Sequence, residues 1–210
     1  MVKPSGQTRV DAKSRILDAA DEIFVRRGID GARMQEIADH AGVNKALLHY
    51  YFRSKAQLAQ AVWFRIASSF APGILQMMAS DVPLGDKIDR CVDAYHATLT
   101  RHPYLMAYVI SEAARHPELL DGFYTAERRR AARQMIDKLR EQIDDGVRAK
   151  KMRPVSAEQF FVTLVSSCLF PFAAWPMLAQ VLGLGASGHR QFMQRRRTDL
   201  PAFLKRALCA

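Results

Sequence analysis

The sequence has few cysteines and spaces them widely. Cys91, Cys168 and Cys209 form no CxxC pair. An odd number of scattered thiols argues against a disulfide framework and a structural zinc site, so we predict a protein of the reducing cytoplasm. Residues 1–8 contain no apolar run of the kind that a secretory signal needs, and we expect them to form a short mobile arm.

The sequence motifs of common catalytic sites are also missing. There is no GxSxG nucleophile elbow, no HExxH zinc motif and no P-loop, since Gly183-Leu184-Gly185 is not followed by Lys-Ser/Thr. Glu112 and His116 share a helix face and have the spacing of a chelating pair, but a surface hydrogen bond is the simpler interpretation. We therefore predict no enzymatic activity, no catalytic residue, no metal site and no cofactor.

Positive charge exceeds negative charge, with 31 Lys and Arg against 21 Asp and Glu. The favoured partners are therefore polyanions, nucleic acid first and an anionic membrane surface second. Residues 1–56 carry only ten basic and seven acidic residues, so the excess lies elsewhere. We interpret the basic runs Arg128–Arg133 and Arg195–Arg197 as solvated helix faces, with a second polyanion contact as the alternative.

One long stretch, Gln159–Gly188, lacks charge altogether. Residues 160–182 are long enough to span a bilayer, which keeps a membrane-associated helical interaction protein as the alternative function. Pro171 and Pro176 interrupt the stretch, and no second segment of this kind occurs. A helix buried between its own domain and a partner subunit has the same composition, and we prefer this interpretation, which involves no membrane.

Helical periodicity dominates the chain, and sustained alternation of apolar and polar residues is absent. We predict an all-α fold of about nine helices, with an amino-terminal three-helix head and a larger helical body. Gly28 is expected to end the first helix, and Pro72-Gly73 to end or kink the fourth. The expected helices cover residues 12–27, 34–40, 45–52, 54–72, a segment after Pro83, 104–115, 118–150, 156–182 and 190–208, with a flexible turn at 183–188.

Residues 34–52 have the features of a helix-turn-helix. Ala38 is small enough for two helices to cross closely, and Gly42 can adopt the positive φ that a short turn needs. Val43 is expected to pack between the helices, and Asn44 to cap the next one. Leu48 then faces inward. The outer side of this recognition helix carries Lys45, Ala46, Leu47, His49 and Tyr50.

Over residues 9–58 the chain resembles the head of the TetR (tetracycline-repressor-like) family. The matching residues are Arg15–Ala20, Phe24, Gly28, Ile37-Ala38, Ala41–Val43, Leu48–Phe52 and Ser54-Lys55. The resemblance implies a cytoplasmic bacterial regulator, nucleoid-associated when bound, with an arm (1–8), a helix-turn-helix DNA-binding domain (9–55) and a ligand-binding and dimerisation domain (56–210). It implies a homodimer through the last two helices, about 156–182 and 190–208. Such a dimer would repress at a pseudo-palindromic double-stranded DNA operator until a small hydrophobic or amphipathic effector releases it.

The resemblance also assigns DNA-binding residues: Arg33, Gln35, Asn44, Lys45, Ala46, Leu47, His49, Tyr50 and Lys55. Lys45 is the candidate for reading guanine, and Lys55 the candidate for a phosphate at a helix amino terminus. Leu47 has two open alternatives, a thymine methyl contact or half-burial. The family often has Thr where Ala32-Arg33 stand, which implies a weaker cap, and Tyr where His49 stands, which implies pH-sensitive binding.

The body is expected to hold the effector among aromatic and polarisable side chains. The candidate ligand-binding residues are Trp63, Tyr95, Tyr104, Tyr108, Phe123, Phe161, Cys168 and Phe172. For each of them a plain role in the hydrophobic core is the alternative. A pocket of this composition would suit a hydrophobic or amphipathic molecule.

Overall fold

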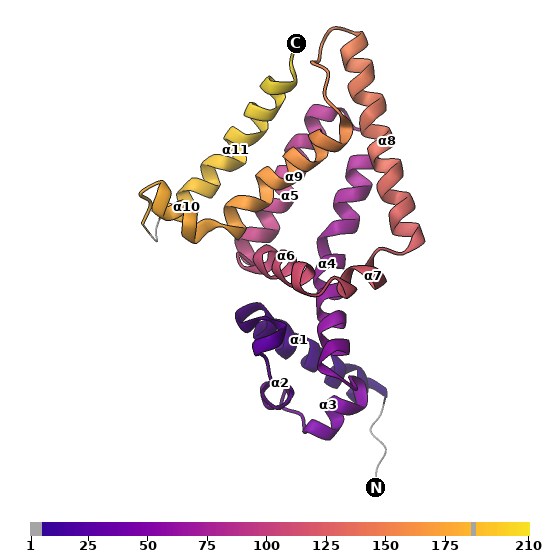
Figure 1. Ribbon diagram of the computed structural model, residues 1–210, viewed down its shortest axis with the longest axis vertical. Coiled ribbons are helices and arrows are strands. Elements are labelled where there is room, and N and C mark those ends of the chain that lie inside the picture. Colours follow the sequence, from indigo (N-terminus) through magenta and orange to yellow (C-terminus); the bar gives the residue numbers. More distant parts are fainter. Residues whose placement is uncertain (1–5, 186–187) are drawn as a thin grey trace. The chain divides into compact units, whose positions relative to one another are not determined.

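The computed structural model describes residues 6–185 and 188–210, and these form an all-α fold (Figure 1). The all-α prediction is confirmed: no strand occurs in the described part of the chain, where an isolated backbone bridge joins Met152 and Cys209. About nine helices were predicted, whereas the described residues form eleven. They are α1 (Gly6–Gly31), α2 (Met34–His40), α3 (Lys45–Tyr51), α4 (Lys55–Ala79), α5 (Leu84–Arg101), α6 (Leu105–Arg115), α7 (Glu118–Phe123), α8 (Ala126–Arg148), α9 (Ala157–Ala173), α10 (Trp175–Val181) and α11 (Gly188–Leu208).

The chain divides into two compact units. The first unit comprises the described residues up to Ser68 together with Tyr108–Phe123, and the second comprises Ser69–Ala107 and Tyr124–Ala210. In the first unit, α2 packs against both α1 and α3. Its core is made of side chains with no exposed surface, namely Ile16, Ala20, Phe24, Ile37, Ala38, Leu48, Leu58 and Val62.

The first helix is longer than the sequence predicted. Residues 1–5 of the expected arm lie outside the described residues, and α1 already begins at Gly6. Gly28 interrupts its helical dihedral angles with a φ of 71°, so the prediction that the regular helix ends there is confirmed. A final turn follows and reaches Gly31.

In the second unit, α5 is the central helix and contacts α8, α9 and α11. Its apolar stripe is buried, with Ile88, Val92, Tyr95 and Leu99 all facing the core. Lys87 is buried beside them, and its Nζ donates to the carbonyl oxygen of Met78 at 2.6 Å and to Gln142 Oε1 at 2.8 Å. These bonds satisfy the ammonium, which burial would otherwise disfavour.

Two predicted helices are each split in the structure. The segment 118–150 forms α7 and α8, because Thr125 Oγ1 accepts the Arg128 N–H at 3.3 Å and starts a new helix there. The segment 156–182 forms α9 and α10. Pro176 lies in the first turn of α10, where the missing N–H is not needed, whereas inside a continuous helix it would leave the carbonyl four residues earlier without a donor.

The sequence predicted two further interruptions of the helices, one at Pro72-Gly73 and one at residues 183–188. Pro72-Gly73 does not end α4, which continues to Ala79 with Pro72 inside the helix. The expected turn at 183–188 begins with Gly183 at a φ of 62°. Residues 186–187 of this turn lie outside the described residues.

The uncharged stretch does not form one long straight helix. Among the described residues, no single helix combines the length and apolar composition that a bilayer crossing requires. Helices α9 and α10 meet those criteria only as a pair, and they are bent by 82° at Ala174.

Candidate nucleic-acid interface

The turn between α2 and α3 is a Schellman motif built around Gly42. Gly42 has a φ of 63°. Its N–H donates to the carbonyl oxygen of Asp39 at 3.1 Å, and the Val43 N–H donates to that of Ala38 at 3.0 Å. A Cβ at position 42 would meet no atom within 4 Å, so the backbone angle rather than space calls for glycine.

Arg15 fastens this turn to α1. Its Nη2 donates to the carbonyl oxygen of Gly42 at 3.2 Å. The two residues are 27 positions apart, and no local pattern in the sequence indicated this role. The contact fixes the turn that sets the angle between α2 and α3.

The start of α3 is capped as predicted. Asn44 has an extended backbone, and its Oδ1 accepts the Leu47 N–H at 2.8 Å. Four residues into the helix, Leu48 is fully buried. The cap and this anchor fix both the first residue of α3 and the face that it turns outward.

The outer face of α3 is exposed and mixed in chemistry. Lys45, Ala46 and His49 are exposed, and Leu47 is half-buried, the second of its two alternatives. Tyr50 exposes 67% of its surface and makes an edge-on ring contact with Tyr51. A short helix with an ammonium, an imidazole and a phenol on one exposed face can donate to base edges and to phosphates.

The first residues of α2 are less tightly held. Arg33 occupies the N-cap without a side-chain cap hydrogen bond, so the predicted weak cap is confirmed. The Arg33 side chain is exposed. Gln35 is also exposed, and its Nε2 donates to Asp39 Oδ1 at 2.8 Å. Within the described residues, the Gln35 side chain is thus engaged with Asp39, whereas the Arg33 guanidinium makes no hydrogen bond that would compete with a phosphate.

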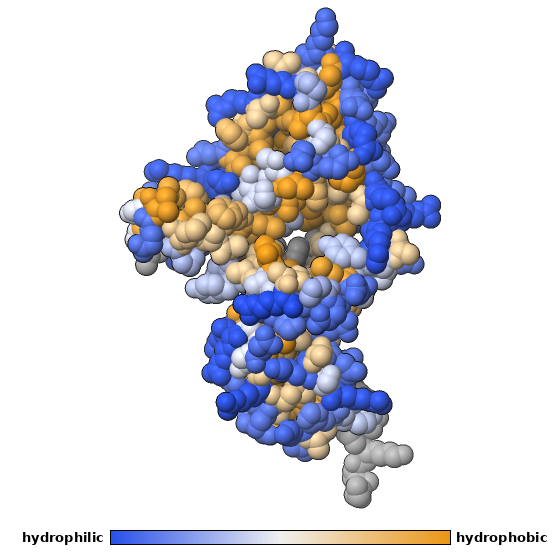
Figure 2. All heavy atoms as spheres, viewed as in Figure 1, coloured by the Kyte–Doolittle hydropathy of each residue, from blue (hydrophilic) through white to orange (hydrophobic). Residues whose placement is uncertain are grey.

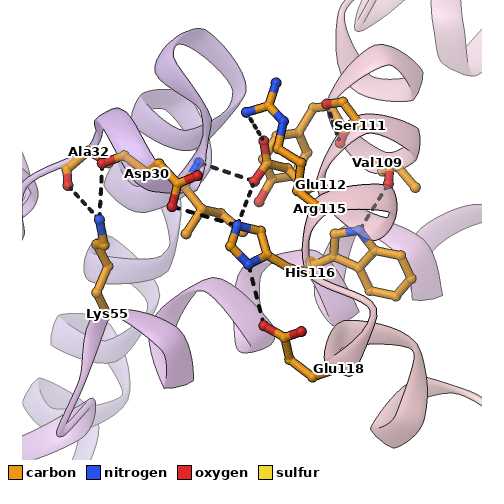
Figure 3. A network of polar contacts seen from close by, with 12 residues as sticks. Asp30, Ala32, Lys55, Val109, Ser111, Glu112, Arg115, His116 and Glu118 are labelled. Carbon is orange, nitrogen blue, oxygen red and sulfur yellow. Dashed lines mark hydrogen bonds and ion pairs between the residues drawn. The ribbon is translucent and has the colours of Figure 1, made fainter.

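Lys55 at the start of α4 is half-buried against the end of α1 (Figure 3). Its Nζ donates to the carbonyl oxygens of Asp30 at 3.1 Å and Ala32 at 3.3 Å. An ammonium has three N–H donors, so one donor remains for a phosphate oxygen. The lysine therefore links the two helices that flank α2 and α3.

A buried carboxylate holds the same end of α1 from α6 (Figure 3). Glu112 exposes 1% of its surface, and its Oε2 accepts the Ile29 N–H at 3.3 Å. A Cβ at position 28 would come within 3.1 Å of Glu112 Oε1, so Gly28 leaves the space that this contact needs. The sequence did not indicate this role, because nothing local distinguishes a buried from an exposed glutamate.

The interpretation of Glu112 and His116 as a surface pair is wrong for Glu112, which is buried. His116 Nε2 lies 3.7 Å from both Glu112 Oε2 and Asp30 Oδ1, and His116 Nδ1 lies 3.3 Å from Glu118 Oε1. In the described part of the chain, no group of three metal-ligating side chains is arranged for an ion. The cluster connects α6 and α7 to the end of α1.

Three candidate ligand residues belong to the core of the first unit. Trp63, Tyr108 and Phe123 are buried, and the rings of Trp63 and Phe123 meet edge to face with centroids 5.2 Å apart. Trp63 Nε1 also donates to the carbonyl oxygen of Val109 at 3.3 Å. These contacts describe Trp63 and Phe123 as packed core side chains.

The other candidates lie in the second unit. Tyr95, Cys168 and Phe172 line a small cavity there, whereas Phe161 is half-buried and Tyr104 exposes 69% of its surface. Neither Phe161 nor Tyr104 lines this cavity. The structure therefore brings together three of the eight expected ligand residues.

Two protein families match parts of this chain. The family described as bacterial regulatory proteins, tetR family, matches residues 16–62, and the tetracyclin repressor-like C-terminal domain matches residues 85–199. The first match covers the helix-turn-helix and its flanking helices. The second covers more than half of the chain.

Individual proteins agree with these matches. The chain is 36% identical over 87 residues to the HTH-type transcriptional activator FasR of Mycolicibacterium smegmatis, covering 41% of this chain and 40% of that protein. It is 34% identical over 100 residues to the HTH-type transcriptional repressor SCO4008 of Streptomyces coelicolor, covering 48% of each chain. The chain thus spans less than half the length of either relative. The crystal structure of the putative transcriptional regulator SCO4942 from Streptomyces coelicolor has the same fold, with a TM-score of 0.63, 18% identity and coverage of 94% of this chain and 98% of that one.

Proposed function

The chain belongs to the TetR family of bacterial regulatory proteins, and we propose that it is a DNA-binding transcriptional regulator whose α3 enters the major groove. We further propose that the protein is a homodimeric repressor, which binds a pseudo-palindromic operator and is released by a small hydrophobic or amphipathic effector. Its partner would be chromosomal DNA in the bacterial cytoplasm.

The observation that carries this proposal is the geometry of the turn. Gly42 closes the carboxy-terminal end of α2, and Asn44, two residues later, caps the start of α3. Leu48 anchors the inner face while Lys45, His49 and Tyr50 remain exposed. A short, fixed helix with its polar amino-terminal residues outward suits docking against base edges.

Contacts around α3 would supply affinity without reading sequence. Arg33 and the remaining donor of Lys55 flank the recognition helix in the chain and suit phosphate oxygens. Asn44, Gln35 and the other exposed residues named above complete the proposed DNA surface. Ala46 would contact a thymine methyl group.

Exposed apolar side chains support dimerisation through the carboxy-terminal helices. Orange residues gather over α10 in Figure 2. The large apolar residues exposed on or beside α9, α10 and α11 are Val162, Phe170, Met177, Val181, Leu182 and Phe203. Such a surface marks an interaction site, and a twofold dimer would present two recognition helices to half-sites about 34–36 Å apart.

The experiment that tests the proposal is selection of bound duplexes from a random DNA pool by the purified full chain. We expect an inverted repeat whose half-sites are about one helical turn apart, with binding that weakens steeply as salt rises. Enrichment of no duplex in dilute buffer would contradict DNA binding. Enrichment of a single half-site would contradict the dimer.

A further inference from the structure

A small cavity lies inside the second unit, between α5, α9 and α11. Its volume is about 20 Å³, which is room for one water-sized group. Val92, Phe172 and Leu200 supply apolar parts of its wall. The basic side chains of His96, Arg196 and Arg197 also line the cavity, and no carboxylate is among its lining residues.

Arg196 is the first of these basic groups. Its Nε and Nη2 donate to the carbonyl oxygen of Ser167 at 3.2 and 2.9 Å. Pro171, four residues after Ser167, has no N–H, so this carbonyl lacks its helical donor and the guanidinium replaces it. Both bonds go to one neutral oxygen.

The charge of Arg196 remains without a counter-ion. In the part of the chain that the structure describes, no carboxylate lies within ion-pair distance of Arg196. Burial lowers the pKa of the guanidinium below its ordinary value. A partly buried cation without a carboxylate is costly unless an anion from outside the chain accompanies it.

His96 faces the same cavity from α5. Its Nε2 is buried and has no hydrogen-bond partner among the described residues. Arg197 differs, because its Nε is paired with Asp93 Oδ1 at 2.6 Å. Among the described residues, the buried atom of this wall without a hydrogen-bond partner is therefore His96 Nε2, and the cation without a carboxylate is Arg196.

Tyr95 adds a third polar group. Burial raises the pKa of its phenol, so the hydroxyl remains a neutral donor at any physiological pH. Its side chain lines the same cavity. Polar and apolar side chains thus line a space of about one water molecule.

We propose that this cavity takes one oxygen of the carboxylate of an acidic effector, with the apolar body of the molecule outside it. A carboxylate accepts charge-assisted hydrogen bonds from a guanidinium and N–H donors of an imidazole, and its charge compensates Arg196. The effector role of this acid rests on the proposed regulatory function. The binding site itself rests only on the cavity.

The first test compares probes that share an apolar body and differ in head group. Octanoate, 1-octanol and octylamine are titrated against the purified chain by calorimetry and by thermal unfolding. Octanoate is expected to bind at least about tenfold more tightly than octanol, the difference that a charge-assisted hydrogen bond provides, and to raise Tm. Equal binding of octanoate and octanol, or no binding of octanoate, would overturn the site.

Variants separate the ligand role of Arg196 from its role at the Ser167 carbonyl. Arg196→Gln keeps an N–H donor for that carbonyl but removes the charge, and it is expected to abolish the preference for octanoate. His96→Leu fills the same wall without a donor and is expected to weaken octanoate binding. Arg195→Gln is the matched control, because this exposed neighbour does not line the cavity.

A carboxylate of a second copy of the chain is the competing occupant. In that case Arg196→Gln weakens self-association in sedimentation experiments and octanoate has no effect on the parent, which overturns the proposal. Unchanged octanoate binding in a folded Arg196→Gln variant also overturns it.

Failure of the site and failure of the proposed function give different results. If octanoate binds in an Arg196-dependent manner but no duplex is ever bound, the regulatory function fails and the carboxylate site stands. If a duplex is bound and octanoate produces no change in Tm, the carboxylate site fails and the regulatory function stands. Release of the duplex by octanoate supports both.

Discussion

The Nζ of Lys55 lies 3.1 Å from the carbonyl oxygen of Asp30, a contact that joins the first turn of α4 to the end of α1 across 25 positions of the chain. On the other side of the same turn, the Ile29 N–H is held by Glu112 of α6. The end of α1 is thus fixed by a cation on its carbonyls and a carboxylate on an N–H. Each contact leads to a separate prediction.

Replacing Lys55 by Ala should weaken binding to every DNA duplex by a similar factor. The side chain would lose its phosphate contact, which carries no sequence information, and its two bonds to Asp30 and Ala32. Fluorescence anisotropy with the selected operator and with a shuffled duplex gives the ratio of the two affinities. That ratio should equal the parent's. The Lys151→Ala variant, which alters an exposed lysine of the second unit, serves as the control. A Lys55→Ala variant that binds like the parent would refute the phosphate assignment.

Alanine at two glycines should change stability in opposite directions. Gly42→Ala forces a side chain into the left-handed region and should destabilise the chain by roughly 1 kcal/mol. Gly73→Ala lies within α4 and should stabilise it by about 0.5–1 kcal/mol. Neither new Cβ meets an atom within 4 Å, so packing does not differ between them. Urea unfolding followed by circular dichroism measures both. Equal effects would contradict the role given to the turn.

Removing the Glu112 carboxylate should loosen the end of α1. Glu112→Ala leaves the buried Ile29 N–H without an acceptor, at a cost of roughly 1–3 kcal/mol in unfolding free energy. Glu112→Gln retains an acceptor oxygen and should lose less. Trp63, which is buried in the same unit, reports unfolding by fluorescence in a Trp175→Phe background.

The exposed Asp121 provides the control for that series, because Asp121→Asn changes a surface carboxylate of α7. Its effect should stay within about 0.5 kcal/mol. If Glu112→Ala unfolds at the same urea concentration as Asp121→Asn, the Glu112 carboxylate does not hold the end of α1.

Local chemistry explains why the helix-turn-helix was predictable. The turn at Gly42 and the cap at Asn44 rest on bonds that span at most five positions, and such bonds leave a recognisable spacing in the sequence. The inward position of Leu48 follows from the same helical period. The start of α8 at Thr125 was not predicted. It depends on a single cap, and the sequence signal of that cap was no stronger than the surrounding helical pattern.

Contacts between distant segments were not predictable in this way. Arg15 holds Gly42, Glu112 holds Ile29, and Arg196 holds the Ser167 carbonyl, each across at least 27 positions. No periodicity records such pairs. The expected ligand residues failed to converge for the same reason, since aromatic composition identifies buried side chains but not which of them share a cavity.

The most direct measurement of the central claim is repetition of the random-duplex selection with the Lys45→Ala variant. If the outer face of α3 reads bases, the variant should lose preference at one base pair in each half-site, with a change of roughly 1–3 kcal/mol there, and keep it elsewhere. A variant that selects the same sequence as the parent at every position, with the same strength, would show that the exposed amino-terminal lysine of α3 does not meet the bases.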